Sequence, residues 1–251
     1  MTKNNVPAKQ TETGFSIVDN PQSAQTIQAA FTEFNLTAAD LTRLKIPAGG
    51  SIAWEVDTLG ETKAEQNLDV IILGVEGNQK AWWATSVDDS AGDNAPSCIS
   101  TDGINGTGIN SLDPTATTGT HKCSECAWNQ FESSRSGGRG KDCKDTSIVF
   151  FVLGDEALPH VLTVPATSLK VVKKYAMQLL SRHIEPSSVI TRLTLEKAMS
   201  GGGHTYSKLA MSKTSDLSEE QADKTRGIAK NFMDRITGGD SLAGFASASE
   251  G

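Results

Sequence analysis

Aromatic residues and long apolar runs are scarce in this 251-residue sequence, in which aromatics make up 6% and tyrosine occurs only 2 times. No apolar stretch approaches the roughly 20 residues that span a bilayer. The start at Met1 lacks the basic and apolar segments of a signal peptide. The sequence therefore predicts a soluble, cytoplasmic protein with a modest core and no membrane partner.

Recognisable catalytic motifs are also missing. The 4 histidines, His121, His160, His183 and His204, do not stand in the H-E-x-x-H or H-x-E spacing of zinc hydrolases and deaminases. The sequence has no G-x-S-x-G nucleophile elbow and no G-x-x-x-x-G-K-[ST] phosphate loop. We therefore predict no catalytic residue and no enzyme activity.

Cysteine is rare, but its spacing is informative. The chain has 4 cysteines, Cys98, Cys123, Cys126 and Cys143, in the pattern C-x24-C-x2-C-x16-C. A reducing compartment favours metal ligands or free thiols over disulfides. The Cys123-x-x-Cys126 pair can bind one ion from a knuckle turn, and four soft thiolates favour zinc or, less often, an iron–sulfur cluster. Because four thiolates fill every position around tetrahedral zinc, the predicted site is structural.

Three other interpretations of the cysteines stay open. His121 can replace one cysteine ligand, and Cys98, the one farthest from the pair, is the candidate for replacement. A redox C-x-x-C motif would need a neighbouring βαβ pattern, which the sequence does not show. The four residues can also be ordinary buried thiols.

Charge is distributed unevenly around a net value of −7. Residues 1–120 carry 6 basic and 15 acidic side chains, whereas residues 160–213 carry 8 basic and 2 acidic ones. A basic element inside an acidic body suits an anionic partner, although the same charges can simply solvate helix faces. The overall acidity argues against avid binding of duplex DNA, which needs a broad basic surface.

Aromatic rings and cations gather around the knuckle, as binding of a single-stranded nucleic acid requires. We predict stacking by four rings and phosphate contacts by seven cations: Trp82, Trp83, Trp128 and Phe131; Arg135, Arg139, Lys141, Lys144, Lys170, Lys173 and Lys174. Adjacent residues of a strand face opposite sides, so at most one of Trp82 and Trp83 can stack. Alternatively, Trp128 and Phe131 pack under the zinc loop as a miniature core.

The pattern of apolar and turn residues divides the chain into three parts. Residues 1–45 are expected to form a loose arm of about 20 residues, a helix over 21–34 and a short helix begun by Thr37. Residues 46–213 form a β core around an excursion at 86–146 that holds every cysteine and that a metal would organise. Residues 214–251 form a helix, opened by a Ser218–Gln221 capping box and ending at Ile236, and a disordered tail.

Within the β core, alternating or β-branched runs predict strands. They cover 52–56, a hairpin of 68–75 and 79–85, and 147–153, 161–164, 189–195 and 205–211. Ser168 is expected to cap one helix on this core.

Five motifs carry a resemblance to a group of proteins encoded by phages and integrative elements. They are Lys45-Ile-Pro-x-Gly-Gly50, Pro96-x-Cys98-x-Ser100-x-Asp102-Gly103, Cys123-x-x-Cys126-x-x-Asn129-x-Phe131, Gly138-x-Gly140-Lys141-x-Cys143-Lys144 and Pro165-x-Thr167-Ser168-Leu169-Lys170. Ala127 stands where the group has proline, and Glu132 where it has glycine. More distantly, the arrangement is similar to the zinc-containing single-stranded DNA-binding proteins of tailed phages.

That resemblance implies an α+β fold: an OB-like antiparallel β-barrel with an inserted zinc-knuckle loop and flanking helices. It also implies a single-stranded DNA-binding protein of phage type, acting in replication or recombination in the host cytoplasm, with replication or recombination proteins as further partners. One alternative is a zinc-stabilised adaptor or inhibitor that binds a host protein through the acidic N-terminal half. Another is a nuclease whose carboxylates converge only in the folded chain.

Overall fold

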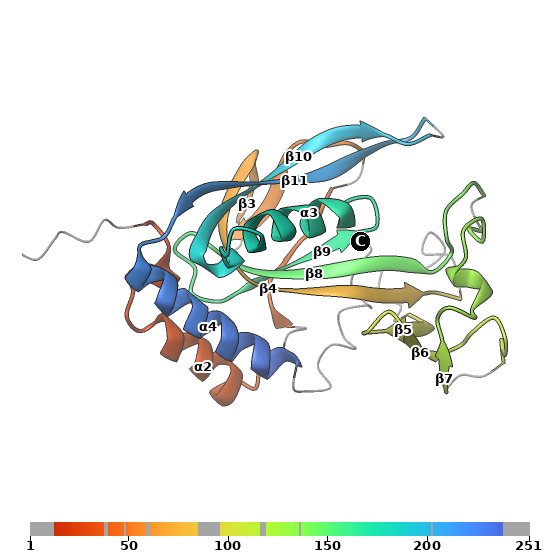
Figure 1. The fold of residues 1–251 in the computed structure, drawn as a ribbon, viewed down its shortest axis with the longest axis horizontal. Coiled ribbons are helices and arrows are strands. Elements are labelled where there is room, and N and C mark those ends of the chain that lie inside the picture. The colour runs from red at the N-terminus through yellow and green to blue at the C-terminus, as the bar shows by residue number, and fades with distance from the viewer. Residues whose placement is uncertain are drawn as a thin grey trace, which may run out of the picture.

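The computed structural model describes residues 13–37, 40–47, 49–58, 61–84, 96–115, 119–135, 137–201 and 203–237. This part of the chain is α+β, with a nine-stranded sheet, a separate two-stranded ribbon and few helices (Figure 1). The predicted α+β class is therefore confirmed. No helix in the described part is both long and apolar enough to cross a membrane.

The sheet branches at its longest strand, β4 (Asn67–Trp82). One edge of β4 pairs with β8 (Lys144–Leu153). The other edge pairs with β10 (Val189–Met199) near the start of β4 and with β5 (Cys98–Ser100) at its end. Beyond β8 the sheet continues to β9 (His160–Pro165) and then to β1 (Arg43–Leu44). Beyond β10 it continues to β11 (Thr205–Asp216). Beyond β5 it continues to β6 (Asn105–Gly108) and then to β7 (Thr120–Lys122).

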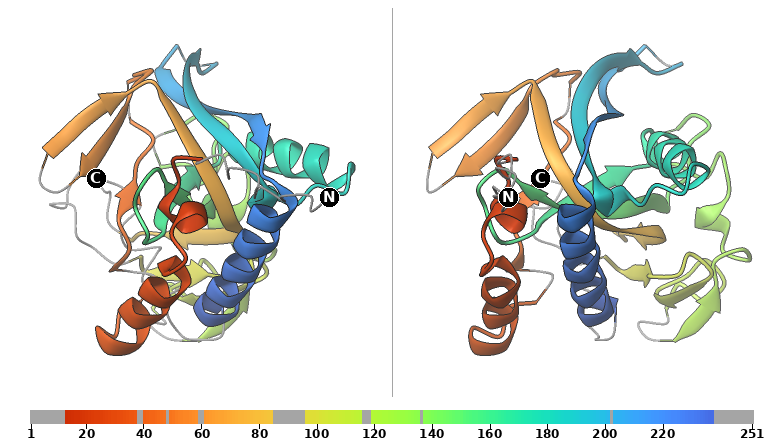
Figure 2. Two further views of the ribbon diagram at one scale, coloured as in Figure 1. Left: turned by 90° about the vertical axis from the view of Figure 1, so that its left-hand side faces the viewer. Right: turned by 60° about the vertical axis from the view of Figure 1, so that its left-hand side comes forward.

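The predicted OB-like barrel is not confirmed. Among the described strands, the order runs from β1 to β7 without a pairing that closes the sheet. β2 (Trp54–Thr58) and β3 (Glu61–Glu65) pair only with each other and project as a ribbon (Figure 2). The physical reason is that one edge of β4 is shared by β10 and β5, so the sheet branches into two arms instead of continuing as a single ring of strands.

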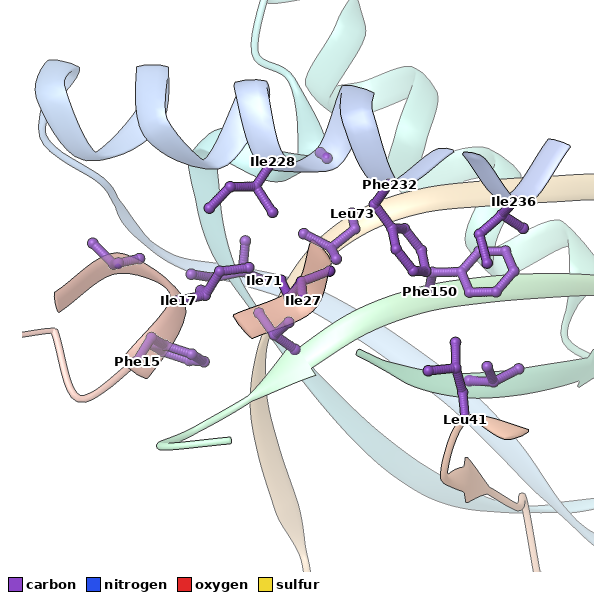
Figure 3. Close-up of a cluster of buried hydrophobic side chains, with 14 of the residues drawn as sticks. Phe15, Ile17, Ile27, Leu41, Ile71, Leu73, Phe150, Ile228, Phe232 and Ile236 are labelled. Carbon is purple, nitrogen blue, oxygen red and sulfur yellow. The ribbon is translucent and has the colours of Figure 1, made fainter. Parts of the chain in front are cut away.

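Two hydrophobic cores cover the two faces of the sheet, because successive strand residues point to opposite sides. On β8, Phe150 packs under α1 (Ser16–Asp19), α2 (Ser23–Glu33) and α4 (Glu219–Thr237), as Figure 3 shows. Its neighbour Phe151 packs on the opposite face with α3 (Leu169–Leu180), β10 and β11. Figure 1 places α2 and α4 at one end of the molecule and β5–β7 at the other.

Several predicted elements are confirmed. The helix at 21–34 is α2, and the strands predicted from residue 147 onward are β8 to β11. The capping box of α4 is present, since Ser218 N donates to Gln221 Oε1 at 3.0 Å and Gln221 N donates to Ser218 Oγ at 3.3 Å. Ser168 is the N-cap of α3, but its hydroxyl accepts from Leu209 N at 3.0 Å instead of capping the helix.

The hairpin predicted from strands at 68–75 and 79–85 is wrong, because residues 68–82 belong to the single strand β4. Residue 85 lies outside the described residues. β8 pairs on both sides of the turn-like Glu76-Gly77-Asn78 segment, which is absorbed as a bulge with Asn78 at φ 66°.

Two N-terminal predictions are also wrong. Phe15 and Ile17 are buried in the core, so residues 13–20 are no loose arm. The short helix expected from Thr37 does not reach Leu44, because Arg43 and Leu44 form β1, which pairs in parallel with β9. Thr37 N donates to Asp40 Oδ2 at 2.8 Å, and residues 38 and 39 lie outside the described residues. The rest of the predicted arm and the tail from Gly238 lie outside the described residues.

Candidate metal centre and nucleic-acid surface

The four cysteines, distant in sequence, line one small cavity of about 10 Å³ at the end of the sheet. Strand pairing brings them together, because Trp82 pairs with Cys98 on one edge of β4 while Ala81 pairs with Lys144 on the other. Cys123 and Cys126 lie in the turn between β7 and the 3-10 helix η3 (Ala127–Asn129). All four cysteines are buried and none forms a disulfide.

Backbone hydrogen bonds fix the turn that carries the cysteine pair. Cys123 N donates to Ile104 O at 2.8 Å, and Cys126 N donates to Cys123 O at 3.4 Å. The Asn129 amide closes the turn by donating to Cys123 O at 2.8 Å. Cys143 is tied to the same loop, since its N donates to Trp128 O at 2.9 Å. The backbone thus holds three of the four cysteines in one loop cluster.

His121 lines the same cavity and lies beside Cys98. Its Nε2 is 3.7 Å from Cys98 Sγ, whereas its Nδ1 is buried and has no hydrogen-bond partner among the described residues. The two side chains meet across β6 at Gly106, where an added Cβ would lie 2.8 Å from His121 Nε2 and 3.2 Å from Cys98 Sγ. Glycine at position 106 therefore makes this approach possible.

The electrostatics of the cavity disfavour thiolates when no cation is bound. Burial, followed by the charges of Cys123 and Cys126, raises the pKa of Cys98 to about 11. Burial likewise raises the pKa of Cys143 to about 12, although the Lys80 ammonium opposes this shift. Burial lowers the pKa of His121, which favours a neutral imidazole. A divalent cation would reverse the effect on the thiols, because a coordinated thiol is deprotonated.

The predicted zinc is not confirmed by the geometry. No group of three or more His, Cys, Asp or Glu side chains in the described part of the chain is arranged so that it could hold a metal ion. The chemistry of the donors nevertheless fits zinc, since four thiols that form no disulfide and one imidazole line the same cavity. Zinc therefore stays a prediction, and His121 stays a possible ligand.

Three of the four predicted stacking rings are used inside the protein. Trp82 and Trp128 stack with ring centroids 3.6 Å apart and an interplanar angle of 5°. Trp82 is buried and donates from Nε1 to Asp142 Oδ2 at 2.6 Å, and Trp83 is buried beside Ala81. Of the four rings, only Phe131 is open to solvent, at 75% exposure.

The predicted phosphate contacts divide into paired and open cations. Arg135 pairs with Asp142 at 2.9 Å, and Lys141 pairs with Asp145 at 3.0 Å. Arg139 is exposed on the segment of residues 123–143, which is called the cysteine loop below. Lys144 is exposed at the start of β8, where its Nζ donates to Lys141 O at 3.4 Å. Lys170, Lys173 and Lys174 are exposed on α3. Lys173 Nζ lies 3.4 Å from Asn78 Oδ1, so α3 sits beside the part of β4 that leads to the cysteines.

Sequence reasoning missed the groups that support this site. Lys80 and Asp145 form an ion pair across β4 and β8, and Ser111 Oγ donates to Cys126 Sγ at 3.5 Å. These partners are 65 and 15 positions apart, so no local pattern signals them. Asp102 belongs to one of the five sequence motifs, but its role in the turn was not predicted. Its Oδ1 accepts hydrogen bonds from Ile104 N at 2.7 Å and from Asn105 N at 2.8 Å. Backbone hydrogen bonds from Asn105 and Ile104 hold the pKa of Asp102 well below its usual range.

Comparison of the chain with protein-family models, with curated proteins and with solved structures found no match. The resemblance to phage single-stranded DNA-binding proteins therefore stays a prediction that depends on the sequence motifs.

Proposed function

We propose that this chain is a single-stranded DNA-binding protein whose cysteine loop is organised by one structural zinc ion. The observation that carries the proposal is Phe131, a solvent-exposed ring with a cation beside it. Lys141 Nζ lies 5.2 Å from the centroid of this ring. An exposed aromatic face next to positive charge can stack on a base while neighbouring cations follow the phosphates.

Exposed cations lie on neighbouring parts of the chain. Arg139 is on the same loop as Phe131, Lys144 begins β8, and Lys173 of α3 meets the β4 bulge at Asn78. In the right-hand view of Figure 2, α3 and the cysteine loop lie on the same side of the sheet. We propose that a single strand runs from Phe131 toward α3, with Lys170, Lys173 and Lys174 contacting its backbone.

Zinc in this proposal is held by Cys98, Cys123, Cys126 and Cys143 and links β5, the knuckle turn and the start of β8. The ion would cross-link these three segments, and its positive charge would stabilise the thiolates. The cysteine loop buries little apolar surface, so such a link would fix the position of Phe131.

Tryptophan fluorescence is a poor probe of this binding, because Trp54, Trp82 and Trp83 are buried and Trp128 is stacked on Trp82. Anisotropy of a labelled oligo-dT strand, titrated with the full zinc-loaded chain, reports binding directly. Stacking is worth about 1–3 kcal/mol per base, so Phe131→Ala should weaken binding about 5- to 150-fold.

Phe34 offers a matched control, since it is also 75% exposed but ends α2 at the opposite end of the molecule. Phe34→Ala should leave affinity unchanged. Replacement of the three α3 lysines by glutamine should reduce the salt dependence of binding, because each phosphate contact releases counterions. Absence of binding at micromolar protein, or equal affinities for the two phenylalanine variants, would contradict the proposal.

A second candidate function is a zinc-stabilised adaptor that binds a basic host protein. It is favoured by the β2–β3 ribbon, which projects from the body and exposes Glu55, Asp57, Glu61 and Glu65 (Figure 2). Its test is the stoichiometric recovery of one host protein after nuclease treatment. That recovery should be lost in Glu61→Gln/Glu65→Gln and kept in Phe131→Ala.

A further inference from the structure

We infer that His121 is not a zinc ligand but the hydrogen-bond donor to the Cys98 thiolate, so that all four cysteines bind the metal. This inference deepens the zinc centre proposed above and rests on it. It assigns a positioning role to a residue whose two ring nitrogens lie in different surroundings.

The distance alone leaves both roles open. Two ligands of one tetrahedral zinc, with bonds of about 2.3 Å to sulfur and 2.0–2.1 Å to nitrogen, lie about 3.6 Å apart. The observed 3.7 Å between Cys98 Sγ and His121 Nε2 is close to that value and is also within reach of an N–H···S hydrogen bond. The surroundings of Nδ1, the other ring nitrogen of His121, therefore decide between the ligand role and the donor role.

The environment of Nδ1 separates the two roles. A histidine that binds zinc through Nε2 carries its proton on Nδ1 and almost always donates it to a carboxylate, a carbonyl or water. Nδ1 of His121 is buried without a partner in the described part of the chain, so a proton there would be an orphaned donor. Buried N–H groups without a hydrogen-bond partner are rare, because they lose the hydrogen bonds that water gives them in the unfolded chain.

The tautomer that carries its proton on Nε2 leaves no buried donor without a partner. With the proton on Nε2, the N–H faces Cys98 Sγ, and Nδ1 presents only a lone pair. Such a donor is useful here because four thiolates around one zinc leave two excess negative charges in a buried cavity. Ser111 Oγ donates to Cys126 Sγ in the same way, and the Lys80 ammonium acts on Cys143. Three of the four sulfurs thus have a compensating group outside the ligand shell.

X-ray absorption spectroscopy at the zinc edge of the full zinc-loaded chain tests the ligand set. Four sulfurs at about 2.3 Å and no nitrogen are expected. Three sulfurs and one nitrogen at about 2.0–2.1 Å would overturn this inference and leave the proposed zinc centre standing. A chain that binds no zinc would contradict the zinc centre itself.

Variants of His121 test the donor role separately. Loss of a group outside the ligand shell typically costs about 10- to 100-fold in metal affinity, so His121→Ala should weaken zinc binding by that factor and keep the four-sulfur spectrum. His121→Gln, whose amide can donate to the same sulfur, should recover part of the loss. His204→Ala, on an exposed turn residue, is the control and should change nothing. An unchanged zinc affinity in His121→Ala would overturn the inference.

Discussion

The body of the sheet and the cysteine loop are two regions of one protein that are held together in different ways. Among the described residues, the two cores of the body contain 19 and 17 buried hydrophobic residues, whereas the two clusters near the cysteine loop contain 2 and 3. Burial of apolar surface is the main favourable term in folding. The body can therefore fold by burial, whereas the loop depends on turns, ion pairs and, as we propose, one metal.

The largest effect is expected from removal of the metal ligands. Cys123→Ser/Cys126→Ser, or chelation of zinc, should remove most of a binding free energy that is about 10–16 kcal/mol in zinc-finger peptides. Hydrogen exchange measured by mass spectrometry should then show protection lost over residues 96–143 and kept in β9 and β10. Equal loss in both regions would show that the loop and the body fold as one unit.

The next prediction weakens the body of the sheet instead of the cysteine loop, by creating a cavity in its core. Phe150 of β8 is fully buried against Phe232 of α4, so Phe150→Ala should lower the free energy of unfolding by about 3–5 kcal/mol. Urea denaturation measures this loss, and zinc affinity in the native state should stay at the wild-type value. A matching fall in zinc affinity would contradict the independence of the two regions.

A smaller effect is expected at the glycine over which His121 and Cys98 meet. In Gly106→Ala the new methyl group would lie 2.8 Å from His121 Nε2, so the imidazole must move away from the sulfur. Zinc affinity, measured by competition with a chelator, should fall at least as far as in His121→Ala, about 10-fold or more. Wild-type affinity in this variant would show that the close approach is not needed.

The smallest effect, of opposite sign, is expected in the body at Gly227. An added Cβ at this α4 position meets nothing within 4 Å. Gly227→Ala should raise the free energy of unfolding by about 0.4–1 kcal/mol, because alanine loses less backbone entropy in a helix. The denaturation midpoint should rise without a change in zinc affinity. Destabilisation would mean that α4 is packed more tightly at this position than the structure shows.

The contrast between the regions also explains what the sequence could predict. Strands and helices of the body were predictable because their apolar patterns are local, as in the continuous apolar run of residues 148–153 in β8. Residues of that run face the two cores alternately. β4 was mistaken for a hairpin because Asn78 is a turn residue, and only pairing with the distant β8 turns it into a bulge. Long-range pairing of this kind leaves no local signal.

The candidate site was predictable in part. The spacing of the cysteines indicated a common site, and the structure places all four around one cavity. The burial of the rings was not predictable, because Trp82 at the end of β4 stacks on Trp128 of η3, 46 positions away in the sequence. The same holds for the cations, since Arg135 and Lys141 meet their carboxylates only in the folded loop.

Metal analysis by mass spectrometry of the purified full chain, without added zinc and after dialysis, tests the proposed zinc centre most directly. One tightly bound zinc per chain, lost in Cys123→Ser/Cys126→Ser, is the predicted result. A folded chain with no bound metal and intact protection over residues 96–143 would contradict it.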